Sequence, residues 1–160
     1  MKIAFDHQIF SRQRYGGISR YFVELARNLP LLGKNITKAN VITPIYNNKY
    51  LYLTGSKVNL SGVYIPDIPK TRKLLRYANN FISPLALRMA NPDIIHETYY
   101  TKKIIGPSKP KRVITIHDMI HEIFPEHFSK NDSTRDAKIN AVSRADHVIC
   151  ISNNTRKDLV

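Results

Sequence analysis

The sequence is poor in cysteine and in acidic residues, and it contains no long apolar run. Its one cysteine in 160 residues, Cys150, cannot form an internal disulfide, so we expect a packed thiol in a reducing compartment. The apolar run after Met1 is too short for a signal peptide, and no later run is long enough to span a bilayer. We therefore expect a protein of the cytoplasm.

Several enzyme classes are disfavoured by motifs that the sequence lacks. It has neither the Gly-x-Ser-x-Gly elbow of hydrolases nor a Gly-Lys-Ser/Thr phosphate loop. Gly16 and Gly17 are not followed by the third spaced glycine of a dinucleotide fingerprint, which disfavours NAD. His117 and His121 are four residues apart, but this spacing forms a metal-binding face only on a helix, and His117 is expected at a strand end. We therefore expect no metal and no cofactor.

The shortage of acidic residues leaves a net charge of +13, from 25 Lys and Arg against 12 Asp and Glu. The excess is concentrated in residues 70–112, which hold ten basic residues against only Asp93 and Glu97. A field of this sign attracts nucleic acid, anionic lipid or phosphorylated substrates. The alternative is a solvated basic face that only aids solubility.

Short runs rich in β-branched residues alternate with helical patterns along the whole chain. Six runs are predicted strands, namely 2–5, 40–45, 58–65, 93–96, 112–116 and 147–151. Helices are predicted at 18–29, 74–81, 84–89 and 132–145, with another from 153. Pro84 is expected to separate the second helix from the third. The alternation predicts one α/β domain over residues 1–160, a Rossmann-like parallel sheet with helices on both faces.

Polar side chains follow the predicted strands at the point where each strand ends. In an open parallel sheet, ligands bind at the carboxyl ends of the strands, so these side chains should share one rim. In chain order they are Asp6, His7, His96, Glu97, Thr98, His117, Asp118, Ser152 and Asn153. An aspartate beside His117 can orient its ring or accept a hydrogen bond from a ligand hydroxyl. The alternative for a lone histidine at a strand end is a hydrogen-bonded structural residue.

The glycine pair at Gly16 and Gly17 precedes a helix with a regular apolar face. Without side chains, the backbone can approach a ligand closely, and the free amides of a helix start favour an anion such as a pyrophosphate. Ser19 and Arg20, in the same turn, are further candidates for substrate binding. The alternative is a tight turn that binds no ligand.

Four segments together resemble family-4 retaining glycosyltransferases, in the right order and over the whole chain. They are YGGISRYFVEL at 15–25, DIIH at 93–96, VITIHD at 113–118 with FPE at 124–126, and ADHVICIS at 145–152 with Thr155 and Asp158-Leu159. The resemblance is closest to mannosyltransferase-like members that build bacterial surface polysaccharides, lipopolysaccharide among them.

The resemblance implies a GT-B architecture, in which two Rossmann-like domains face each other across a cleft and no metal is required. Residues 1–160 would be the N-terminal, acceptor-side domain, and a C-terminal domain outside this chain would bind the sugar nucleotide. The complete enzyme would then transfer a hexose, mannose being one candidate, to a lipid-linked or polysaccharide acceptor. The isolated domain is expected to be inactive.

The resemblance also assigns roles to single residues. Gly16 and Gly17 would face the donor diphosphate, and His117 would contact the transferred sugar near the reacting carbon. Asp118 would support that site. The basic, partly apolar stretch 70–88 would dock on anionic lipid, which places the enzyme peripherally on the inner face of the cell membrane.

Two other interpretations compete with this one. A pI near 10 and nine tyrosines fit a nucleic-acid-binding module, but the tyrosines are scattered outside the basic cluster, the segment 99–103 is the one suggestive place, and no recognised motif is present. Nucleic acid is therefore a disfavoured partner. The second alternative is a different sugar-nucleotide enzyme of GT-B architecture, such as an epimerase.

Overall fold

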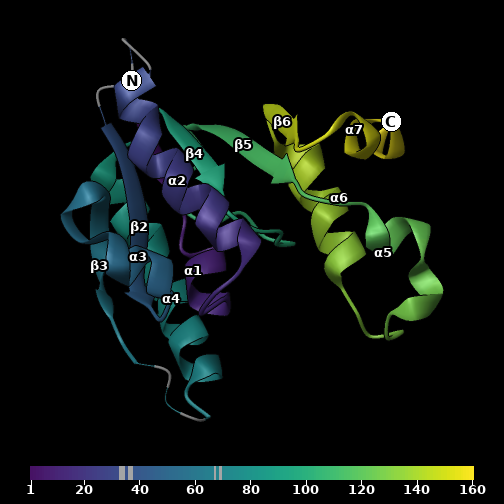
Figure 1. Ribbon diagram of the computed structural model, residues 1–160, viewed down its shortest axis with the longest axis horizontal. Coiled ribbons are helices and arrows are strands. Elements are labelled where there is room, and N and C mark those ends of the chain that lie inside the picture. Colours follow the sequence, from purple (N-terminus) through teal and green to yellow (C-terminus); the bar gives the residue numbers. More distant parts are fainter. Residues whose placement is uncertain (33–34, 36–37, 67, 69) are drawn as a thin grey trace.

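The computed structural model describes residues 1–32, 35, 38–66, 68 and 70–160. Six strands form one parallel sheet in the order β3-β2-β1-β4-β5-β6 (Figure 1). The strands are β1 (Lys2–Phe5), β2 (Lys38–Tyr46), β3 (Asn59–Tyr64), β4 (Ile94–Glu97), β5 (Lys111–Ile116) and β6 (His147–Cys150). The helices are α1 (Gln8–Arg12), α2 (Gly17–Leu32), α3 (Lys49–Thr54), α4 (Arg72–Ala90), α5 (Ile120–Ile123), α6 (Thr134–Arg144) and α7 (Asn153–Leu159), with 3-10 turns η1 (Gly55–Lys57) and η2 (Pro125–His127).

The sheet is covered on both faces because side chains alternate along each strand. On one face, Phe5 and Val41 pack against Phe22 of α2. On the other face, Ala4 and Ile95 pack against the helix α4, which lies behind the sheet in Figure 1. The helix α6 covers β5 on that second face. The predicted α/β class, a Rossmann-like parallel sheet with helices on both faces, is confirmed.

A smaller core joins β5 to α6. Ile114 and Ile116 of β5 are buried against Ala137 and Ala141, which lie one turn apart on α6. Between β5 and α6, the segment with α5 and η2 extends away from the sheet in Figure 1.

The predicted helix break at Pro84 is wrong, because α4 runs without interruption from Arg72 to Ala90. A proline inside a helix removes one amide donor, here the one that would bond to the carbonyl of residue 80. Asn80 is exposed, so water can satisfy that carbonyl. Three short helices, α1, α3 and α5, form in segments where the sequence pattern predicts no helix.

Within the described residues, no helix has both the length and the apolar character needed to cross a membrane.

Candidate functional site at the carboxyl rim

The structure brings the start of α2 against the ends of β4 and β5. Phe22 is the link, since its ring contacts the His96 ring edge-on at 5.1 Å and the His117 ring at 6.0 Å. The ring of Tyr21 also contacts His117, with the two centroids 5.6 Å apart. The apolar face of α2 therefore fixes where the Gly16-Gly17 turn lies relative to His117.

His117, the predicted sugar contact, combines a half-buried side chain with an unpartnered ring nitrogen. It follows β5, it is half-buried, and its backbone amide donates to the hydroxyl of Tyr100 at 3.2 Å. Its Nε2 is buried and has no hydrogen-bond partner in the described part of the chain. Burial lowers the pKa of His117, and nearby Asp118 opposes that shift. A neutral imidazole with a free ring nitrogen can donate or accept one hydrogen bond from a sugar hydroxyl.

Asp118 lies beside His117 with its side chain half-exposed, so it is open to solvent and to a ligand. Its position is held from below by Lys138 of α6, which donates to the Asp118 carbonyl at 2.8 Å. The same ammonium donates to Glu122 at 2.7 Å. Lys138 is only 2% exposed, an unusual location for a lysine, which is buried only when it is paired. This role could not be predicted from the sequence, because the polar pattern of α6 is typical of a surface helix.

The turn before α2 is built from Gln13 and Asn48. The side-chain amide of Asn48 donates to the carbonyl of Gln13 at 2.7 Å, and its oxygen accepts from the amide of Leu51 at the start of α3. The side-chain oxygen of Gln13 in turn accepts from the amide of Ser19. Asn48 follows the predicted second strand, so the strand-end rule applied to the first, fourth, fifth and sixth strands would have found it as well.

The two glycines differ in their surroundings. A β-carbon at Gly16 would lie 2.2 Å from the side-chain oxygen of Gln13, whereas one at Gly17 would have no heavy atom within 4 Å. Gly17 begins α2, and its amide and that of Ile18 have no acceptor among the described residues. Free amides at a helix start favour an anion. Gly17 therefore offers open space beside two free donors.

Ser19 and Arg20 are neighbours in α2 but differ in exposure to solvent. The Ser19 side chain is fully buried and donates to the carbonyl of Gly16 at 3.0 Å, so it stabilises the turn. Arg20 is exposed and can reach an anion near the helix start. Only the second of these two residues is placed for contact with a ligand.

His96 lies beneath the rim. It is 4% exposed, its ring packs between Phe5 and Phe22, and its Nε2 shares a hydrogen bond of 2.9 Å with the hydroxyl of Thr115. Burial lowers the pKa of His96 to about 4, with a smaller contribution from His117. This geometry favours a supporting role for His96, under the side chain of His117, over the predicted contact with substrate.

Glu97 is also buried, on the opposite face of β4, and it is 2% exposed. Its carboxylate accepts from Arg112 at 2.9 Å and forms a second, two-pronged ion pair with Arg144 at the end of α6. Arg112 also donates to the carbonyls of Ile105 and Pro107, which ties the 101–110 loop to the sheet. The geometry again favours a supporting role, because both carboxylate oxygens already have partners.

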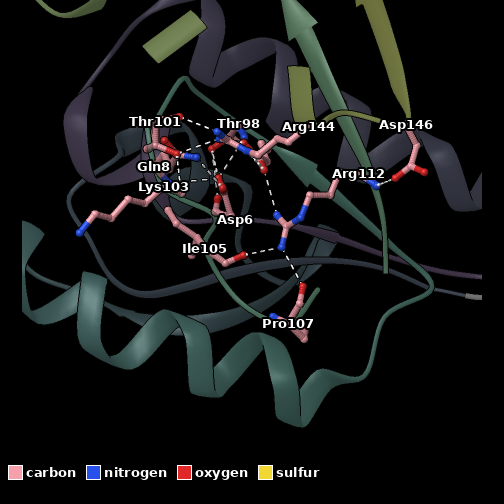
Figure 2. Close-up of polar contacts among 11 residues, drawn as sticks. Asp6, Gln8, Thr98, Thr101, Lys103, Ile105, Pro107, Arg112, Arg144 and Asp146 are labelled. Atoms are coloured by element: carbon pink, nitrogen blue, oxygen red, sulfur yellow. Dashed lines mark hydrogen bonds and ion pairs between the residues drawn. The ribbon is translucent and has the colours of Figure 1, made fainter. Parts of the chain in front are cut away.

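Asp6 holds the ends of β1 and β4 together. Its fully buried carboxylate accepts from the amide of Thr98 at 2.9 Å, from the Thr98 hydroxyl at 2.6 Å and from Gln8 at 2.7 Å (Figure 2). The same hydroxyl accepts from the amide of Ile9 in α1. The rim therefore has a rigid underside built from charged and polar groups, with His117, Asp118 and Gly17 above it.

The described residues contain no group of three or more His, Cys, Asp or Glu side chains that could hold a metal ion. His121 packs its ring on Phe128 at 3.9 Å and approaches Asp132, so it lies with the 120–132 segment. The rim's own groups, a neutral imidazole, free amides and an exposed arginine, suit hydroxyls and anions.

Comparison with known proteins identifies the family and the fold. The sequence profile described as Glycosyltransferase Family 4 matches residues 15–160. No curated protein sequence matches the chain. Among solved structures, the chain is similar to HepE of Anabaena, crystallised in complex with UDP, at 19% identity and a TM-score of 0.57. The match covers 99% of this chain and 40% of HepE, so the chain spans less than half of that protein's length. At this identity the likeness bears on the fold alone.

Proposed function

Because the chain belongs to glycosyltransferase family 4, we propose that it is the acceptor-side domain of a retaining enzyme that transfers a hexose from a sugar nucleotide. Such an enzyme has GT-B architecture, and the donor would lie largely on a second domain. The UDP bound in the crystal structure of HepE supports a nucleotide-linked donor. Mannose is the first candidate sugar, and a lipid-linked or polysaccharide chain is the proposed acceptor.

The observation that carries the proposal is the meeting of His117 with the start of α2. The half-buried side chain of His117, whose buried Nε2 has no partner among the described residues, is the proposed contact for a hydroxyl of the transferred sugar, and the free amides at Gly17 suit the diphosphate of the donor. Arg20 adds a positive charge beside that diphosphate. In this role the domain binds and orients, and electrostatic stabilisation of the leaving diphosphate supplies the rate gain.

The test is a donor screen with the full-length product of the gene. UDP-hexoses and GDP-hexoses are incubated with the enzyme and with membrane lipid extract as acceptor, and release of the nucleoside diphosphate is measured. We expect acceptor-dependent release from one donor class. No release from any donor, with a protein that is folded by circular dichroism, would contradict the proposal.

We further propose that α4 attaches this enzyme to the inner face of the cell membrane. Its outer surface is an unpartnered apolar stripe, in which Phe81 is 83% and Met89 78% exposed. The remaining members of the stripe are Leu74, Tyr77 and Leu85. Lys73, Arg76 and Arg88 are exposed on the same helix, which gives it the composition of an interfacial helix on anionic lipid.

The membrane proposal is tested by co-sedimentation with liposomes that contain phosphatidylglycerol. We expect binding at low salt that decreases as salt is added, and a loss of binding in Phe81→Ser. The matched control is Leu53→Ser, since Leu53 is 72% exposed on α3 and lies outside the stripe. Equal binding by the two variants, or no binding by the wild type, would contradict the proposal.

A further inference from the structure

A cavity of about 360 Å³ lies between α1, the first turns of α4 and Tyr99, which lies two residues after the end of β4. Its wall carries three cationic side chains, Arg12, Lys73 and Arg76, together with Tyr99. No acidic residue lines it, and within the described residues none of the three cations forms an ion pair. The cavity is therefore an uncompensated positive site.

The position of Arg12 is fixed by its neighbours. Its guanidinium lies over the ring of Tyr99, 4.9 Å from the centroid. Burial lowers the pKa of Arg12; Tyr99 opposes that shift, Arg76 adds to it and Asp6 opposes it. The nearest buried carboxylate, Asp6, is already occupied by Thr98 and Gln8. Arg12 and Arg76 line the same cavity and neither forms an ion pair among the described residues, so an anion bound between them would relieve the repulsion of two like charges.

The volume and chemistry of the cavity select a class of ligand. About 360 Å³ is at the small end of the range for ligand sites, so the cavity suits a phosphate or diphosphate group with part of the molecule attached to it. Guanidinium groups bind phosphate through paired, charge-assisted hydrogen bonds. A whole sugar nucleotide would need a larger site.

The cavity is adjacent to the rim and to the first turns of α4, the helix that carries the exposed apolar stripe. The ring of Tyr99 packs on that of Tyr100, whose hydroxyl accepts from the amide of His117. At the other side, Lys73 precedes Leu74, the first exposed apolar residue of α4. A phosphate in this cavity would lie between the transferase site and the lipid surface.

We propose that the α1–α4 cavity binds the phosphate or diphosphate group of the acceptor. That the ligand is an acceptor rests on the proposed transferase function. The binding of a phosphate group in the cavity does not depend on any transfer reaction. Two sources share this chemistry, a lipid-linked diphosphate and a soluble phosphorylated sugar. The lipid-linked source is favoured because Lys73 and Arg76 of the cavity belong to α4, the helix that carries the exposed apolar stripe.

Binding is measured by calorimetry on the 160-residue chain, without sugar nucleotide, using pyrophosphate, decyl diphosphate and glucose 1-phosphate. We expect saturable binding that Arg76→Gln weakens about tenfold or more. The matched control is Arg88→Gln, an equal loss of charge on the same helix outside the cavity, and it should weaken binding at most about twofold. Preference for decyl diphosphate identifies the lipid-linked source, and preference for glucose 1-phosphate identifies the soluble one.

Two results would overturn the inference. One is the absence of binding by all three probes to a folded wild-type chain. The other is an equal weakening of binding by Arg76→Gln and Arg88→Gln, which would mean that binding depends on net charge alone. Because no donor sugar is present, these results are separate from a failure of the donor screen.

Discussion

The buried ion cluster under the rim gives the sharpest prediction for stability. Glu97→Gln removes the one negative charge that two arginines share. The side chains of Glu97, Arg112 and Arg144 are 2%, 5% and 12% exposed, so water cannot replace the lost carboxylate. Breaking a buried pair by removing one partner costs about 3–5 kcal/mol. For a domain of this size, such a loss lowers the unfolding midpoint by about 6–20 °C.

The control is an exposed ion pair subjected to the same substitution. Glu24 pairs with Arg27 on α2, and the two side chains are 45% and 42% exposed. Because such pairs contribute little, Glu24→Gln should cost no more than about 0.5 kcal/mol.

Both variants are measured by urea unfolding followed by circular dichroism, with the slope checked to confirm that the transition is unchanged. The predicted order is a large loss for Glu97→Gln and almost none for Glu24→Gln. If Glu97→Gln stays within about 1 kcal/mol of the wild type, the two arginines are not held by that carboxylate and the reasoning is refuted.

Three further predictions follow from single side chains. Burial lowers the pKa of His96 to about 4, so between pH 6.5 and 4 the unfolded chain holds a proton that the folded chain does not. Stability should therefore fall with falling pH by up to about 1.4 kcal/mol per unit. Between pH 7 and pH 5, the free energy of unfolding measured in urea should drop less in His96→Gln than in the wild type. An equal drop in the two proteins would be evidence against this reasoning. Gly17→Ala should leave stability unchanged or raise it by up to about 1 kcal/mol, since the added methyl meets no atom, while donor-dependent turnover falls; unchanged turnover would mean that no ligand approaches there. Lys138→Met should reduce both stability and turnover, because the loop after β5 loses two hydrogen bonds. Proteolysis of that loop should also be faster in the variant. An unchanged cleavage rate would refute the positioning role of Lys138.

The helix pattern and the strand-end rule account for what could be predicted. The apolar positions from Ile18 to Leu29 predicted α2, and residues 93–96 and 112–116 predicted β4 and β5 to within one residue at either end. Those predictions rest on local periodicity, which the fold preserves. The rim followed from them, because parallel strands end at one edge of the sheet.

What could not be predicted depends on contacts between distant residues. His96 and Glu97 are neighbours in sequence, yet one faces Phe22 of α2 and the other faces Arg144 of α6. Whether a polar residue at a strand end contacts ligand or lies below it depends on which helix covers it. That choice is made by residues tens of positions away, and no local pattern records it. The burial of Lys138 was missed for the same reason.

The central claim, that His117 belongs to a glycosyltransferase site, is tested most directly by one kinetic comparison. His117→Ala and His127→Ala are made in the full-length gene product, and turnover is measured with the donor found in the screen. His127 is the control because its side chain is 72% exposed on η2, away from the rim. We expect turnover of His117→Ala to fall about 100-fold, the cost of losing one precise contact to the reacting sugar, while circular dichroism shows a folded protein. His127→Ala should match the wild type. Turnover of His117→Ala within about twofold of the wild type would remove His117 from the site and contradict the account.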